Sequence, residues 1–66
     1  MRYFNTTATN IGVAHVTIEN HGQWVTGVII NFDNHGEIIQ RIERTFASDI
    51  LAPMIVKHLV LEINAG

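Results

Sequence analysis

The chain has 66 residues, of which 47% are hydrophobic and 15% are charged, and its formal net charge is −2. Four basic side chains against six acidic ones leave no basic patch for phosphates, so nucleic-acid binding is not expected. Cysteine is absent, which excludes disulfides and thiolate metal sites, and no apolar run reaches the ~18 residues of a membrane span.

A single domain covering residues 1–66 is expected, and it is a small one. A domain of this size buries only ~60% of the surface that its unfolded chain exposes, so it commonly needs a partner or a metal for stability. The N-terminal stretch MRYFNTTATN has no apolar core of a signal peptide, which predicts a cytoplasmic protein. This stretch is polar and rich in threonine, and its secondary structure stays open.

Two strands are predicted next. Residues 11–19 (IGVAHVTIE) alternate with a period of two and are rich in β-branched residues. Residues 23–33 (QWVTGVIINFD) carry Trp24 and Val28 on one face and Val25 and Ile29 on the other. Apolar residues on both faces are typical of a central strand that is covered on two sides. Gly27 inside this strand indicates a close approach of another element or a bulge.

Residues 37–46 (EIIQRIERTF) fit either a strand or a helix, and the turn before them favours a strand. Ser48 is a candidate N-cap and Asp49 a first-turn residue for a C-terminal helix that ends at NAG. Residues 58–64 (HLVLEIN) also alternate, so a strand is the competing interpretation there. The resulting fold class is α+β, a three-stranded antiparallel β-meander with a C-terminal α-helix packed on one face.

The triplet NHG occurs at 20–22 and at 34–36, and both copies fit hairpin turns with glycine in the left-handed region. Such turns place His21 and His35 at opposite ends of the middle strand, roughly 35 Å apart, too far to share a metal ion. His58 and Glu62 are spaced to pair on a helix, and we favour this pairing over metal binding. No metal or cofactor site is therefore predicted.

Catalytic motifs are missing from the sequence. There is no cysteine nucleophile, no GxSxG elbow and no phosphate-binding loop, and Ser48 is the only serine. We therefore expect a protein that is not an enzyme. A small metal-binding protein or enzyme that uses His15, His58 and Glu62 is the weaker alternative.

Excess apolar surface predicts a partner. The C-terminal helix has two apolar stripes where docking on its own sheet needs one, and the middle strand is apolar on both faces. The expected contact is a homodimer, through the helix or the uncovered sheet face. The candidate partner-binding residues are Val25, Ile29, Ile50, Met54 and Leu61.

The predicted function is a small protein-interaction module. The order of three strands and a helix resembles several small phage- and plasmid-encoded inhibitors and antitoxins, which implies a protein that binds and occludes a host protein. This is a likeness of fold order alone. A structural homo-oligomer is the alternative.

Overall fold

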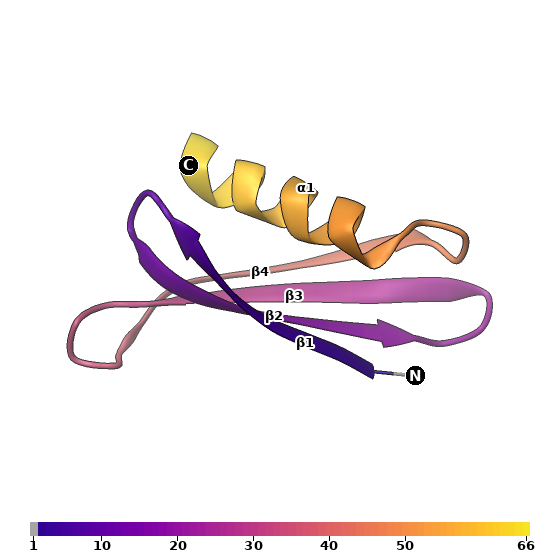
Figure 1. Cartoon of the computed structure of the whole chain (residues 1–66), viewed down its shortest axis with the longest axis horizontal. Coiled ribbons are helices and arrows are strands. Elements are labelled where there is room, and N and C mark those ends of the chain that lie inside the picture. Colours follow the sequence, from indigo (N-terminus) through magenta and orange to yellow (C-terminus); the bar gives the residue numbers. More distant parts are fainter. Residues whose placement is uncertain (1) are drawn as a thin grey trace.

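A computed structural model describes residues 2–66. Four strands form one antiparallel sheet in the order β1-β2-β3-β4, and a single helix crosses one face of it (Figure 1). The elements are β1 (Arg2–Thr9), β2 (Gly12–Asn20), β3 (Trp24–Phe32), β4 (Ile38–Ala47) and α1 (Ala52–Ala65). The α+β class, the meander and the C-terminal helix are confirmed, but the sheet has four strands rather than three.

The additional strand is β1, formed by the segment that the sequence left open. It pairs along its whole length with β2, from Tyr3 opposite Ile18 to Thr9 opposite Gly12. Threonine suits a strand because its branched Cβ packs well on a pleated surface. The segment lacks a regular apolar alternation, since Asn5 and Thr7 share the covered side with Tyr3. Hydrophobic period alone therefore could not identify it.

The second NHG triplet forms the predicted turn between β3 and β4. The backbone N–H of Gly36 donates to the carbonyl of Asp33 at 3.1 Å, and Gly36 has a φ of 78°. Oδ1 of Asp33 accepts the backbone N–H groups of His35 and Glu37 at 2.8 and 2.9 Å. Asp33 thus closes the loop with its side chain as well as with its backbone.

The first triplet turns in a different way. The backbone N–H of His21 donates to the carbonyl of Trp24 at 2.9 Å, so Gly22 and Gln23 are the two central residues. Gly22 has a φ of 93°, as a two-residue hairpin with glycine at its first central position requires. The turn was expected at residues 19–22, with Gly22 as its last residue. The observed turn lies two residues later, at residues 21–24, so this prediction of its position is wrong. The two histidines do lie at opposite ends of β3, since His21 precedes its first residue and His35 follows its last.

The helix begins later than Ser48. Leu51 is its N-cap residue, and Pro53 lies in the first turn. A helix starting at Asp49 would place Pro53 where a backbone N–H must donate to an earlier carbonyl, which proline cannot do. The strand alternative for residues 58–64 is wrong, and β4 confirms the strand expected over residues 37–46.

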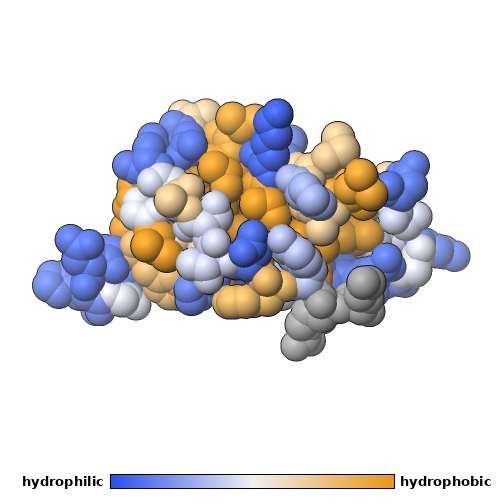
Figure 2. All heavy atoms as spheres, in the orientation of Figure 1, coloured by the Kyte–Doolittle hydropathy of each residue, from blue (hydrophilic) through white to orange (hydrophobic). Residues whose placement is uncertain are grey.

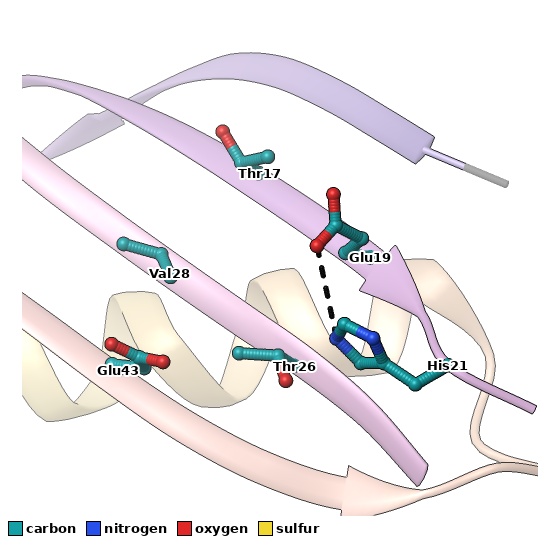
Figure 3. Close-up of a pocket in the computed structure, with 6 residues that line it drawn as sticks. All are labelled: Thr17, Glu19, His21, Thr26, Val28 and Glu43. Carbon is teal, nitrogen blue, oxygen red and sulfur yellow. Dashed lines mark ion pairs between the residues drawn. The ribbon is translucent and has the colours of Figure 1, made fainter. Parts of the chain in front are cut away.

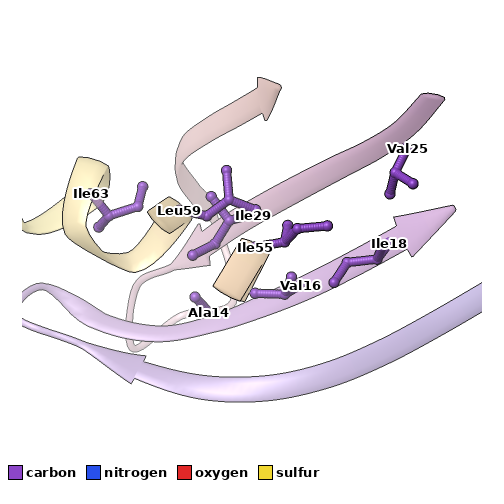
Figure 4. Close-up of a cluster of buried hydrophobic side chains, with 8 residues drawn as sticks. All are labelled: Ala14, Val16, Ile18, Val25, Ile29, Ile55, Leu59 and Ile63. Atoms are coloured by element: carbon purple, nitrogen blue, oxygen red, sulfur yellow. The ribbon is translucent and has the colours of Figure 1, made fainter. Parts of the chain in front are cut away.

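The core lies between α1 and the two central strands (Figure 4). Ile55, Leu59 and Ile63, spaced by one helical turn each, are at most 1% exposed. Beneath them β2 and β3 supply the remaining buried hydrophobic residues, which are Ala14, Val16, Ile18, Val25 and Ile29. Gly27 lets the helix approach closely, because a Cβ there would lie 2.7 Å from Cγ2 of Ile55.

Candidate interaction surface

The helix covers the face of the sheet that carries Val25 and Ile29, and it leaves the opposite face open. We call this opposite face the open sheet face. Alternation along the strands and the strand register assign its members. They are Phe4, Thr6 and Ala8 of β1, Val13, His15, Thr17 and Glu19 of β2, Trp24, Thr26, Val28, Ile30 and Phe32 of β3, and Ile38, Arg41, Glu43, Thr45 and Ala47 of β4.

One end of the open sheet face is an apolar row that crosses all four strands. Val13 pairs with Ala8 on one side and with Phe32 on the other, and Phe32 pairs with Ile38. Val13 is 53% exposed and Ile38 is 60% exposed. A continuous row of this kind on the surface is unlike the scattered single apolar residues of an ordinary protein surface.

Aromatic rings extend this apolar surface toward the centre of the sheet. The imidazole of His15 lies between two of them, with ring centroids 5.3 Å from Phe4 and 5.0 Å from Phe32. Phe4 is 62% exposed. Such contacts orient the three rings before any partner arrives, which lowers the entropy that binding must offset.

The other half of the open sheet face is hollowed and more polar (Figure 3). A depression of about 420 Å³ is lined by Thr17, Glu19, His21, Thr26, Val28 and Glu43. Nε2 of His21 lies 3.8 Å from Oε1 of Glu19, and the imidazole stacks on Trp24 at a centroid distance of 5.2 Å. The imidazole of His21 therefore lies between this depression and the exposed indole of Trp24.

The chemistry available in this depression is limited. Glu19 on β2 and Glu43 on β4 lie two strand spacings apart across the sheet and two residues apart along it, so their backbones are separated by about 12 Å. Oε1 of Glu43 is held by Nη2 of Arg41 at 3.0 Å. Within residues 2–66, no three histidine, aspartate or glutamate side chains gather as metal ligands.

The predicted pairing of His58 with Glu62 is present on the helix. Nε2 of His58 lies 3.2 Å from Oε2 of Glu62, while Oε1 accepts Nε and Nη2 of Arg44 at 3.1 and 2.8 Å. A guanidinium beside this carboxylate disfavours a metal cation there. The cluster ties α1 to β4, and His15 lies on the other side of the sheet.

The five predicted partner-binding residues fall into three places. Val25 and Ile29 are 3% and 0% exposed in the core, so their assignment to a contact surface is corrected. The side of β3 that the helix covers is opposite to the expected one, because Gly27 admits the helix there. Ile50 is partly buried against the core. Met54 and Leu61 are 58% and 57% exposed and line a shallow depression on the helix.

An apolar groove also runs between the helix and the β1 side of the sheet. Figure 2 shows hydrophobic residues reaching the surface between the helix and the strands below it. Near the start of the helix the groove has a volume of about 220 Å³, and its walls include Tyr3, Ile50, Leu51 and Ile55. This is smaller than the ~300 Å³ typical of ligand pockets.

Sequence reasoning did not identify Phe4 and Val13 as surface residues. Val13 alternates with the buried Ala14 and Val16, but its exposure depends on which face the helix covers. Phe4 belongs to a strand that was not predicted. The alternation of Phe4 with Tyr3 and Asn5 was the available signal, and it was too short to interpret alone.

Comparison with known proteins finds no matching family model, no similar curated protein and no similar solved structure. Among residues 2–66, no helix has the length and hydropathy that crossing a membrane requires.

Proposed function

We propose that the chain is a small protein-interaction module without catalytic activity, and that the open sheet face is its binding surface. The observation that carries this proposal is the apolar row of Ala8, Val13, Phe32 and Ile38, continued by the aromatic side chain of Phe4. These side chains contribute to the surface of the sheet and not to the core beneath the helix.

The energetics of the sheet support this proposal. Burying one large apolar side chain contributes roughly 1.5–3 kcal/mol. Phe4, Val13 and Ile38 are each more than half exposed. Covering the three would release free energy comparable with the ~5 kcal/mol stability of a small domain. A partner that covers the open sheet face therefore gains substantially from the contact.

Charge argues for a protein partner over a nucleic acid. Aromatic side chains on an open sheet also stack bases, but single-strand binding relies on a positively charged groove as well. On this face Arg41 is already paired with Glu43, and Glu19 adds a further acidic group. The apolar row at one end of this face lies beside mixed charges, and protein interfaces likewise combine apolar and polar areas.

The outer side of the helix is the weaker candidate surface. Leu51, Met54 and Leu61 are exposed there, but Lys57 and His58 lie between Met54 and Leu61. Its apolar residues do not form a continuous row. Occlusion of another protein and assembly into a structural homo-oligomer are both forms that binding through the open sheet face can take.

Site-specific photo-cross-linking tests the proposal. A photoreactive amino acid at Thr6, on the open sheet face, is compared with one at Lys57, on the outer side of the helix. We expect polypeptide adducts from Thr6 that disappear when Val13→Ser removes part of the apolar row. Adducts from Lys57 alone would move the binding surface to the helix and overturn the proposal, as would adducts from Thr6 that Val13→Ser leaves unchanged.

A further inference from the structure

We infer that the occupant of the open sheet face is a second copy of this chain, packed face to face about a two-fold axis that runs parallel to the strands. The inference rests on the proposed binding surface and names its partner and its geometry. The resulting dimer has four layers, with the two sheets inside and one helix on each outer side.

The area of the face is sufficient for such a dimer. Four strands at ~4.8 Å spacing and nine residues at ~3.3 Å each give a sheet of roughly 19 Å by 30 Å. Each copy therefore contributes about 570 Å². The total of about 1,140 Å² exceeds the ~1,000 Å² minimum of a biological protein interface.

Self-complementarity selects the direction of the two-fold axis. An axis parallel to the strands, between β2 and β3, keeps each row of residues above the same row of the second copy. Val13 then lies over Phe32 of the second copy, and Phe32 lies over its Val13, so the apolar row covers itself. Aligned packing of two sheets at ≈ −30° is the ordinary geometry of a β-sandwich.

The perpendicular two-fold axis is less favourable. It would place Glu43 of one copy over Glu43 of the other at the centre of the contact, because Glu43 belongs to the middle row with Val28 and Thr17. It would also lay the apolar row over the hollowed end near Trp24. Like charges facing each other across an interface oppose association. With the axis parallel to the strands, the row of Glu43 brings Phe4 of the second copy over this side chain instead.

The chain offers a direct test because it contains no cysteine. With the axis parallel to the strands, the two Val13 Cα atoms are about 11 Å apart, from a ~10 Å sheet separation and one strand spacing. With the perpendicular axis, they are roughly 28 Å apart. A disulfide needs Cα atoms within ~7 Å, so a thiol-reactive cross-linker that spans about 10 Å is the suitable probe.

Val13→Cys is compared with Lys57→Cys in the purified chain. We expect Val13→Cys to give a covalent dimer with the short cross-linker and Lys57→Cys to remain monomeric. Gel filtration with light scattering should give about twice the 7.4 kDa chain mass for the parent chain. Val13→Glu should weaken association at least a hundredfold, whereas Leu61→Glu, at a similarly exposed position on the helix, should not.

Two outcomes overturn the inference in different ways. In the first, the parent chain is monomeric at 100 micromolar and Thr6 forms adducts with another polypeptide. The second copy is then not the partner, but the proposed binding surface stands. If the chain forms a dimer that Leu61→Glu dissociates but Val13→Glu leaves intact, both the face-to-face dimer and the proposed binding surface are wrong. Circular dichroism of each variant establishes that the sheet and helix are retained, and the cross-linking result does not depend on either glutamate.

Discussion

Gly27 of β3 lies directly beneath Ile55 of α1, so that a Cβ atom on the glycine would stand 2.7 Å from Cγ2 of the isoleucine. Leu59 and Phe46 have atoms within 3.2 and 3.3 Å of the same point. The absence of a side chain at Gly27 therefore lets the helix pack closely on this face of the sheet, and the open sheet face stays uncovered.

Gly27→Ala is expected to destabilise the fold by about 1–3 kcal/mol, because the added methyl group overpacks the contact with a branched side chain. The midpoint of thermal unfolding should fall by roughly 4–8 °C for each kcal/mol lost. Thr26→Ala is the control, because Thr26 is the neighbouring residue on the open sheet face. Equal melting temperatures for the two variants would contradict the close approach of helix and sheet.

The turn between β3 and β4 makes a second prediction. Gly36→Val is expected to cost about 1–2 kcal/mol, because a β-branched residue is strained at a φ of 78°. His35→Ala should change stability by less than about 0.5 kcal/mol, since the side chain is exposed at the loop and its backbone N–H still reaches Asp33. Denaturant unfolding of both variants gives the comparison. A larger loss for His35→Ala would show that this imidazole has a structural partner.

The ion pair between Arg44 of β4 and Glu62 of α1 gives a third prediction. Glu62→Gln removes the carboxylate that Arg44 and His58 contact, and we expect a loss of about 0.5–1 kcal/mol at low ionic strength. The difference from the parent chain should shrink at 1 M salt, where screening acts over ~3 Å. Arg41→Gln, which disrupts the exposed pair with Glu43, is the matched control and should cost less. A salt-independent loss at Glu62 would indicate packing instead of charge.

The sequence predicted the features that depend on local chemistry. Period-two alternation identified β2 and β3, and the spacing of His58 and Glu62 predicted their pairing. The two NHG triplets indicated the hairpins on either side of β3, although the first turn lies two residues later than expected. The start of the helix required weighing Ser48 as a cap against Pro53 as a constraint, and the constraint prevails because a missing N–H cannot be restored by a cap.

The face of β3 that the helix covers could not be predicted from the alternation of this strand alone. β3 has large apolar residues on both faces, so Val25 and Ile29 are equivalent to Val28 and Ile30 by hydropathy. Gly27 breaks this equivalence through shape, since it leaves room for Ile55. The secondary structure of β1 stayed open for another reason, because its own residues on the covered side are mostly polar and show no hydrophobic period.

The last prediction concerns His15 and follows from the face-to-face dimer. The two-fold axis places this imidazole over Ile30 of the second copy, while Phe4 and Phe32 already flank it within its own chain. In the same row, Arg41 of β4 is the charged side chain, and Thr6 of β1 is uncharged. Association therefore buries the imidazole of His15 against apolar groups, with a cation and no carboxylate in its row.

We expect the dimer to be tighter at pH 8 than at pH 5.5, by roughly tenfold or more, because acid charges a side chain that association buries. Overall charge does not explain such a change, since protonating all four histidines takes the formal charge from −2 to +2, which has the same magnitude (−2 + 4 = +2). His21 also borders this face, where its Nε2 lies 3.8 Å from Oε1 of Glu19. Sedimentation of His15→Phe should show a tighter dimer whose pH dependence is largely lost. A dimer that His15→Phe weakens, or whose pH dependence survives the substitution, would place His15 outside the contact.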